Sequence, residues 1–427
     1  MSIILNGTNG VTNASWTTAG RPSSPAAGQV GFNTTLNVME TYTGSAWVSS
    51  DLPAPSTSGN VLTSDGTTWT SAAASSYVLK NRIINGACVI AQYGTTSLTV
   101  DNTAVKYGVD RMAAYGNIAA SKFTVQQNAG SVTPPVGYTK YLGATSSSAY
   151  AVAATDVFYI YQRIEGFNIA DLAWGTANAK TVTLSFQVYS SLTGTFGGSI
   201  ANGGETRSYA FSYSIPTANT WTTISVTIPG DTSGTWTSDN TAGMEVNFSL
   251  GAGTSRSGTA NTWTASMLYQ PTGATSVVGT SSATWYVTGV QLEIGSTATT
   301  FERRLYNQEL ANCQRYYYRI TPGANQIEFG CGMAQNTAVA DGNIPFLVSM
   351  RTAPTALEQD GTAADYGMQV GGGARTNCSA VPGFNNATTV QSNVRFTRAS
   401  GLTAGQIILF QTGSSGSTAY LAWSAEL

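Results

Sequence analysis

Apolar and polar residues alternate with a period of two through several short stretches of this sequence. Residues 182–188 alternate in this way, and the pattern recurs at 224–228 and at 244–250. Successive side chains of a strand point to opposite faces, so each stretch predicts a strand with one buried and one solvated face. Gly, Asn, Thr and Pro separate these stretches at short spacing. Such a pattern is typical of two antiparallel sheets packed as a sandwich.

The alternation predicts an all-β fold in three parts. The first is an N-terminal β-hairpin stalk over 1–80, and the second is a central antiparallel jelly-roll sandwich over 81–303. The third part, 304–427, combines a short linker helix with a C-terminal β-sandwich. Within this last part, 346–354 is expected to form a strand that Pro354 ends.

One segment has the periodicity of a helix instead. Tyr306, Leu310, Cys313 and Tyr317 are spaced so that they fall on one face of a helix. A helix of about three turns is marginal by itself in water. The apolar face is therefore expected to pack on the rest of the chain.

Charged residues are scarce in this sequence, at 9% of 427 residues, with a net charge of −2. Nucleic-acid binding needs a basic field, so nucleic acid is not an expected partner. No stretch approaches the roughly 18 apolar residues that a membrane span requires, and membrane insertion is not expected. The first residues lack the basic start of a signal peptide.

The sequence contains no histidine, which excludes histidine-based acid–base catalysis, Ser-His-Asp triads and histidine metal ligands. The cysteines are scattered without a CxxC pair, and we expect them to be reduced and mostly buried. They are Cys88, Cys313, Cys331 and Cys378. No catalytic residue, metal or cofactor is predicted.

A short repeat in the N-terminal region places one tryptophan after each of two turns. Residues 44–49 recur in similar form at 66–71, and the copies carry Trp47 and Trp69. An isolated two-stranded hairpin cannot bury such a side chain. We therefore expect several chains to associate with Trp47 and Trp69 facing a common axis. The alternative is that the hairpins lie on the main body of the same chain.

Several segments resemble tail fibres and related structural proteins of tailed bacteriophages. The matching segments are RPSSPAAGQVGFNTT with YTGSAW at 21–47, NRIING at 81–86, YGVDR at 107–111, and the run from WYVTGVQLEIG to LYNQELANCQRYY at 285–317. The resemblance implies a homotrimeric fibre that attaches to another virion protein through its N-terminal region. It also implies assembly in the host cytoplasm and a final location in the virion.

The two ends of the central part also resemble those of carbohydrate-binding jelly-roll modules. NRIING at 81–86 resembles their opening strand, and WYVTGVQLEIG at 285–295 their closing strand. These modules often hold calcium with acidic residues near these strands. Here Cys88, Thr288 and Gly289 stand where acids would be expected, so no calcium site is predicted.

The expected partner outside the virion is a host cell-surface glycan. Exposed aromatic rings bind the apolar faces of sugars, and Asn, Asp, Gln and Arg bond to the hydroxyls. Aromatic residues in turn-rich sequence are the candidates: Trp174, Trp236, Trp263, Tyr138 and Tyr141. Trp221 precedes a clean strand and is expected in the core. Each of the candidate rings could also be part of a core, because large aromatics dominate cores.

The sequence therefore favours a tail fibre that binds host surface glycan without hydrolysing it. The alternative is a capsid decoration or head fibre protein. A polysaccharide depolymerase would need a pair of carboxylates but no histidine. The acids to consider are Asp231 with Asp239, and Glu358 with Asp360 and Asp365. Asp beside Gly, Ser or Thr also caps tight turns, which is the competing interpretation of both groups.

Overall fold

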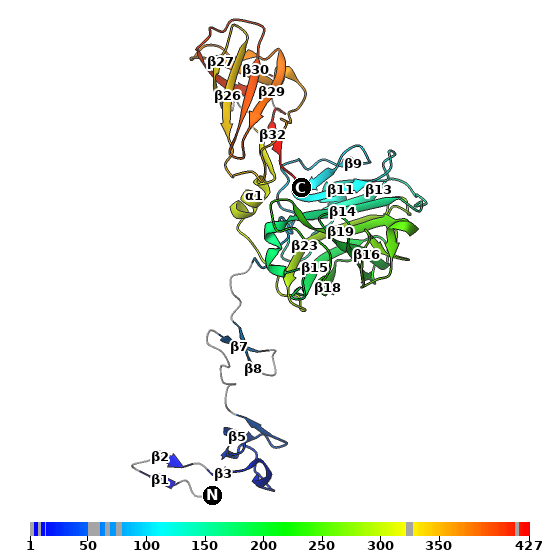
Figure 1. Cartoon of the computed structure of the whole chain (residues 1–427), viewed down its shortest axis with the longest axis vertical. Coiled ribbons are helices and arrows are strands. Elements are labelled where there is room, and N and C mark those ends of the chain that lie inside the picture. The colour runs from blue at the N-terminus through cyan, green and yellow to red at the C-terminus, as the bar shows by residue number, and fades with distance from the viewer. Residues whose placement is uncertain are drawn as a thin grey trace. The chain divides into compact units, whose positions relative to one another are not determined.

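The fold of this chain is nearly all β. The computed structural model describes residues 4–6, 10–12, 14–49, 60–64, 69–73, 79–321, 328–414 and 418–427. Within them α1 (Tyr306–Gln314) is the single α-helix. The chain forms two compact units, Met1–Val78 and Leu79–Leu427. The predicted all-β class is thereby confirmed (Figure 1).

The N-terminal unit is built around a small four-stranded sheet. Its strands, in spatial order, are β3 (Ser15–Trp16), β4 (Val30–Asn33), β5 (Val38–Tyr42) and β6 (Trp47–Ser49), with η1 (Thr18–Gly20) after β3. Two further strand pairs are β1 (Ile4–Asn6) with β2 (Gly10–Thr12), and β7 (Asn60–Ser64) with β8 (Trp69–Ala73). The hairpin of β4 and β5 is antiparallel, with Val30 opposite Thr41.

Trp16 forms the core of this small sheet. Its ring lies directly over Gly31, where a Cβ atom would come within 2.1 Å of the ring, so a side chain there would have to displace it. The Trp16 ring is 4.7 Å from that of Trp47, which also lies 5.4 Å from Tyr42. The expectation that Trp47 has no partner in its own chain is therefore wrong, because β3 supplies one. The side chain of Trp69 lies outside the described part of the chain.

Glu40 is a buried carboxylate beneath this tryptophan. It accepts hydrogen bonds from Arg21 Nε at 3.0 Å and from Trp16 Nε1 at 3.2 Å. The bond from Arg21 is the main reason that the pKa of Glu40 is lowered to about 2, against the opposing effect of burial. The folded unit therefore holds Glu40 in its charged form.

We expect the N-terminal unit to lose stability as the pH falls from about 4.5 to about 2. The pKa of Glu40 is lower in the folded than in the unfolded chain, so its stabilisation is complete above the unfolded value and disappears as the pH falls through the folded value. Thermal melting followed by the indole NMR signal of Trp16 measures this. Glu40→Gln should show a weaker pH dependence, and an equal dependence in both proteins would contradict the assignment.

The second unit contains a sandwich of two antiparallel sheets (Figure 1). The seven-stranded sheet has the order β10 (Lys106–Val109), β11 (Met112–Gly116), β14 (Val157–Glu165), β19 (Ala242–Ala252), β16 (Gly194–Asn202), β17 (Ser208–Ile215), β21 (Trp263–Thr264). The six-stranded sheet has the order β18 (Thr222–Ile228), β15 (Val182–Ser190), β23 (Thr284–Ile294), β13 (Leu142–Ser146), β12 (Phe123–Gln127), β9 (Leu98–Val100). The chain passes repeatedly from one sheet to the other, as in a jelly roll.

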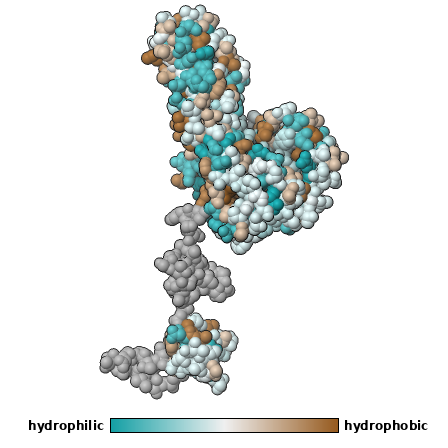
Figure 2. Space-filling view, viewed as in Figure 1, coloured by the Kyte–Doolittle hydropathy of each residue, from teal (hydrophilic) through white to brown (hydrophobic). Residues whose placement is uncertain are grey.

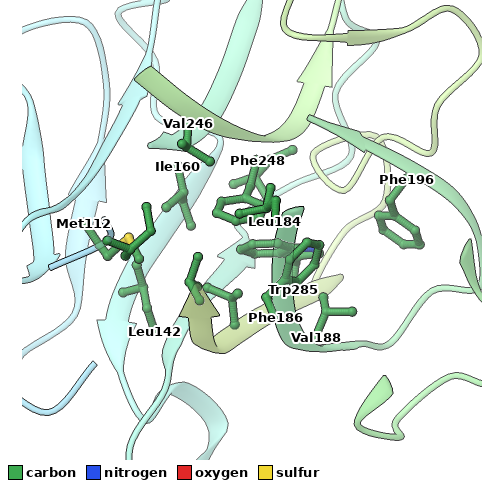
Figure 3. Packing of buried hydrophobic residues seen from close by; sticks show 14 of the residues in the cluster. Met112, Leu142, Ile160, Leu184, Phe186, Val188, Phe196, Val246, Phe248 and Trp285 are labelled. Carbon is green, nitrogen blue, oxygen red and sulfur yellow. The ribbon is translucent and has the colours of Figure 1, made fainter. Parts of the chain in front are cut away.

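The core lies between the two sheets, where apolar side chains from both point toward one another (Figure 3). The predicted alternation is confirmed in β15, whose Leu184 and Phe186 are buried. Phe186 lies 5.1 Å from Phe248 of the facing sheet. Trp285 is also buried, and its Nε1 donates to the Tyr213 hydroxyl at 2.9 Å. Each such buried side chain contributes about 1.5–3 kcal/mol of hydrophobic stabilisation.

Short elements complete the sandwich. They are η2 (Ala129–Ser131), η3 (Gly166–Asn168), η4 (Ala170–Leu172), η5 (Thr254–Arg256), β20 (Ser257–Gly258) and β22 (Gln270–Pro271). Tyr269, which precedes β22, packs on Tyr159 of β14 with 4.6 Å between ring centroids. The segment from η5 to β22 thus contributes a ring to a second apolar cluster, which lies outside the central core.

The C-terminal region has its own sheet and core. The sheet has the order β28 (Thr376–Asn377), β27 (Tyr366–Val370), β31 (Ile407–Thr412), β25 (Glu328–Ala334), β26 (Val339–Pro345), β30 (Gln391–Thr397), β29 (Ala380–Ala387). β24 (Tyr317–Ile320) pairs with β32 (Leu421–Ser424), and η6 (Ala363–Asp365) precedes β27. The predicted strand at 346–354 is wrong, because the strand in this region ends at Pro345.

Helix α1 was expected at this place, and its buried face agrees with the prediction in part, because Cys313 is fully buried. Tyr306 is 64% exposed, and Tyr317 lies beyond the helix in β24. Glu309 is buried instead, because its carboxylate accepts a hydrogen bond from the backbone N–H of Asn85 and pairs with Arg304. Glu309 thus has two fixed polar partners, Asn85 in the jelly roll and Arg304 just before the helix.

The jelly roll and the C-terminal sheet are joined by a charged junction. Glu165, at the end of β14, is 2% exposed and accepts hydrogen bonds from Arg315 Nε at 2.9 Å and from the Tyr316 hydroxyl at 2.7 Å. Arg111 lies 3.6 Å above the Tyr316 ring and forms an ion pair with Glu426. These contacts connect the sandwich with residues that precede the C-terminal sheet in the chain and with Glu426, which follows it.

Aromatic stacking extends the same junction. The Tyr93 ring is 4.7 Å from Tyr107 and 3.6 Å from Tyr317, nearly parallel to both. Arg319 donates from Nη1 to the carbonyl oxygen of Gln92 at 3.0 Å. On the face shown in Figure 2, the hydrophobic residues of the described chain form only small patches among hydrophilic and neutral ones.

Candidate functional site

Three of the predicted aromatic residues meet at one edge of the jelly roll. The ring centroid of Trp174 is 4.7 Å from that of Trp236 and 5.4 Å from that of Trp263. Trp236 and Trp263 are 5.8 Å apart, and each pair of rings is close to perpendicular. We call these three residues the tryptophan cluster.

The cluster is assembled from segments that are distant in sequence. Trp174 follows η4, Trp236 lies in the loop between β18 and β19, and Trp263 is in β21. Pairing of β21 with β17 places Trp263 directly opposite Tyr209. Three separate connections of the sandwich therefore converge on one site at the edge of the seven-stranded sheet.

The three rings differ in exposure. Trp174 is only 6% exposed and donates from Nε1 to the carbonyl oxygen of Lys180 at 2.7 Å, so the expectation that it is an exposed ring is wrong. Trp236 and Trp263 are half-buried. The indole N–H of Trp263 donates to the Pro229 carbonyl oxygen at 2.9 Å. Trp174 supports the other two rings, whose remaining accessible surface is apolar.

A buried ion pair lies under the cluster. Asp231 accepts two hydrogen bonds from Arg207, at 2.6 and 2.7 Å, and one from Trp236 Nε1 at 3.2 Å. The backbone N–H of Ser233 also donates to Asp231 at 3.1 Å. Asp231 is buried, so it anchors both the loop and the indole of Trp236. Sequence inspection missed Arg207, because nothing in its local pattern marks it as a partner.

The two predicted tyrosines lie elsewhere. Tyr141 is fully buried, so its predicted exposure is wrong; its hydroxyl donates to the Ala129 carbonyl oxygen at 2.6 Å, and its ring stacks on Tyr286. Tyr138 is half-buried and packs against Phe301 at 5.5 Å. Among the described residues, neither tyrosine has a ring contact with the tryptophan cluster. Their binding role stays a prediction that the geometry does not favour.

Trp221, which was expected in the core, is half-buried in a separate aromatic group. Its ring is 5.5 Å from Tyr141 and 5.5 Å from Tyr189. Its Nε1 donates to the Thr133 carbonyl oxygen at 2.9 Å. Trp221 therefore resembles Trp263 in exposure and hydrogen bonding but lies outside the cluster.

The first carboxylate pair has structural partners. Asp231 is held by Arg207, as described above. Asp239 is exposed and accepts hydrogen bonds from the backbone N–H of Thr241 at 2.9 Å and from its hydroxyl, and the hydroxyl bond is the main reason that its pKa is lowered. Both contacts are those of a turn-capping residue.

The second group of acids lies in the C-terminal region. Glu358 accepts a hydrogen bond from the Tyr317 hydroxyl at 3.0 Å. Burial is the main reason that the pKa of Asp360 is raised, and a hydrogen bond to Asp365 adds to this. Asp365 also accepts from the Thr418 hydroxyl at 3.0 Å. Asp360 and Asp365 thus bond to each other and to the Thr418 hydroxyl, whereas Glu358 bonds to neither of them.

The structure also bears on metals and membranes. Among the described residues, no group of three or more Cys, Asp or Glu is placed to hold a metal ion. Cys88, at a position that the resemblance associates with calcium, is fully buried, and burial raises the pKa of its thiol to about 12. In the same part of the chain, no helix has the length and apolar character that a membrane crossing requires.

No family model and no curated protein matches this chain. Among solved structures it is similar to the enzymatically active domain of tailspike protein 4 from bacteriophage CBA120, at 11% identity and a TM-score of 0.25, over 50% of this chain and 21% of that chain. It therefore spans about a fifth of the length of that domain.

Two further solved structures match with TM-scores no higher than this. A family 11 carbohydrate-binding module from Clostridium thermocellum matches at 13% identity and a TM-score of 0.25, over 48% of this chain and 99% of that chain. A structure from Sulfolobus Turreted Icosahedral Virus matches at 12% identity and a TM-score of 0.17, over 78% of each chain. TM-scores of this size assign neither a fold nor a function to the chain.

Proposed function

We propose that this chain is a bacteriophage tail fibre protein that binds host surface glycan through the tryptophan cluster and does not hydrolyse it. The observation that carries the proposal is the convergence of Trp174, Trp236 and Trp263, three tryptophans from distant segments, at one edge of the jelly roll. The resemblance of the segments at 21–47 and 285–317 to phage fibres supports the location in a virion.

The chemistry of the cluster suits a sugar. The apolar face of a pyranose stacks on an aromatic ring. Trp236 and Trp263 are held in place by their indole hydrogen bonds and by Trp174, so little side-chain entropy is lost when a ligand binds. Since Arg207 and Asp231 neutralise each other, binding should depend little on salt.

The non-enzymatic part of the proposal rests on the carboxylates. Hydrolysis of a glycosidic bond needs one acid that can give a proton and a second that acts as base or nucleophile. Near the cluster, Asp231 is bound by Arg207, and Asp239 caps its own turn. Neither is arranged as the acid of such a pair.

Association into a homotrimer is proposed for the N-terminal unit, which would also attach to another virion protein. Val30 of β4 and Val48 of β6 are 42% and 44% exposed. Both lie opposite Thr41 of β5, on the face away from Trp16. Two exposed valines on one face of a small sheet are suited to packing against other copies.

Replacing Trp236 or Trp263 with Ala should weaken glycan binding about 10- to 100-fold, roughly 1–3 kcal/mol, because each replacement removes one of the two accessible rings of the tryptophan cluster. The intact chain is tested on an array of bacterial surface polysaccharides at low and high salt. Its mass in solution is measured first, and we expect it to be that of three chains. Trp221→Ala is the matched control, since this tryptophan is similarly half-buried outside the cluster.

The outcomes separate the alternatives. Two folded variants that bind as well as the wild type would show that the cluster is not the binding site. A wild-type chain that binds no surface polysaccharide would favour a capsid decoration or head fibre protein. Release of shortened saccharides would contradict the non-enzymatic proposal.

A further inference from the structure

A shallow polar groove of about 710 Å³ lies on the C-terminal sheet, far along the chain from the tryptophan cluster. It is formed by β27, β28 and the end of β31. Its lining side chains are Gln369, Ala374, Arg375, Thr376, Asn377, Gln411 and Ser414. None of them is aromatic, and only Ala374 is apolar, so the groove suits a polar ligand.

The floor of the groove is preorganised by its own amides. Gln411 is only 6% exposed and donates from Nε2 to Gln369 Oε1 at 2.8 Å. Gln369 in turn donates to the Gly373 carbonyl oxygen at 2.7 Å. At the end of the groove, Asn377 donates to the Ser414 hydroxyl at 2.7 Å and accepts from its backbone N–H at 3.0 Å. Amide and hydroxyl groups can each donate and accept, which matches the hydroxyls of a saccharide.

Arg375 supplies the charge of this groove. Eight arginines of the described residues form ion pairs with acids. Arg375 has neither an ion pair nor a hydrogen bond within the described part of the chain. Its Cγ and Cδ lie over Gly367, 3.0 Å from where a Cβ atom would be, so the stem is held by the sheet. The carboxylate of Glu328, in β25 on the opposite side of β31 from β27, accepts a hydrogen bond from Gln411 Nε2 at 3.5 Å and forms no ion pair with Arg375.

We propose that this groove is a second saccharide site, specific for an acidic sugar. The sugar carboxylate pairs with the guanidinium of Arg375, whose planar fork fits a carboxylate. Adjacent sugar hydroxyls bond to the amides of Gln369 and Asn377 and to the Thr376 hydroxyl. A peptide is a poorer fit, because the lining offers no apolar pocket for its side chains.

The test uses the full chain and two matched pairs of probes. Oligogalacturonate is compared with its methyl ester, and sialyllactose with lactose, by calorimetric titration at low and high salt. The wild type should bind at least one acidic probe at least tenfold more tightly than its neutral partner, and less tightly at high salt. Arg375→Gln should lose this binding by about 10- to 100-fold, and Arg375→Lys should restore part of it.

Arg398→Gln is the matched control, because Arg398 follows β30 of the same sheet, outside the groove, and its side chain bonds only locally, to the Ser400 carbonyl oxygen. It should bind like the wild type. Trp236→Ala should also keep acidic binding, so failure of this site and failure of the tryptophan cluster are distinguishable. A wild type that binds neither acidic probe, or a folded Arg375→Gln that binds unchanged, overturns the proposal.

Discussion

Replacing Glu165 with Ala should lower the free energy of unfolding of the second unit by about 2–4 kcal/mol. The change removes the acceptor of Arg315 and of the Tyr316 hydroxyl at the junction of the jelly roll and the C-terminal sheet. Breaking a buried pair from one side costs about 3–5 kcal/mol, and the partial exposure of Arg315 reduces this value. For the second unit of the variant we expect calorimetry to resolve two transitions, one for the jelly roll and one for the C-terminal sheet, where the wild-type unit has one.

The control for this variant is Asp341→Ala. Asp341 pairs with Arg395 at 2.8 Å, but Arg395 is largely exposed, so its loss should cost at most about 1 kcal/mol. A Glu165→Ala variant that is no less stable than Asp341→Ala would show that the junction does not hold the jelly roll and the C-terminal sheet together.

Replacing Asp231 with Ala should lower the free energy of unfolding by about 3–5 kcal/mol and also abolish the glycan binding that we propose for the tryptophan cluster. Asp231 is buried and accepts hydrogen bonds from Arg207, Ser233 and Trp236. Its removal leaves the guanidinium of Arg207 without its acid and frees the loop that carries Trp236. Urea unfolding and polysaccharide binding measure the two effects.

Asp239→Ala provides the matched comparison, because it removes a carboxylate from the same loop that only caps a turn. Loss of a cap costs about 0.5–2 kcal/mol, and binding should persist. If both variants lose equal stability, the support that we assign to Asp231 is wrong.

The regular strands could be predicted from the sequence because their burial is one-sided. In β15 and β18 one face carries large apolar residues, and side-chain alternation alone identifies such strands. The strand β26 was missed because its sequence, VADGNIP, has few large apolar side chains, and cross-strand pairing with β30 stabilises it. The contact of Trp16 with Trp47 was also missed, since β3 is only two residues long.

The candidate site was predictable in part. Turn-rich sequence suggested that Trp236 and Trp263 are exposed rings, and the structure shows both as half-buried rings packed against the core. The same criterion failed for Tyr141, which is fully buried and directly precedes the strand β13. Neither the ion pair of Asp231 nor the groove beside Arg375 could be predicted, because both depend on which strands become neighbours in the sheets.

The junction at Glu165 also limits how this gene can exchange parts with others. A crossover between the codons for 78 and 79 would transfer the sandwich and the C-terminal sheet together, with every contact of the junction intact. A crossover near codon 304 would leave Glu165, Arg111 and Tyr93 facing a foreign surface. Viable recombinants should therefore inherit residues 79–427 as one block.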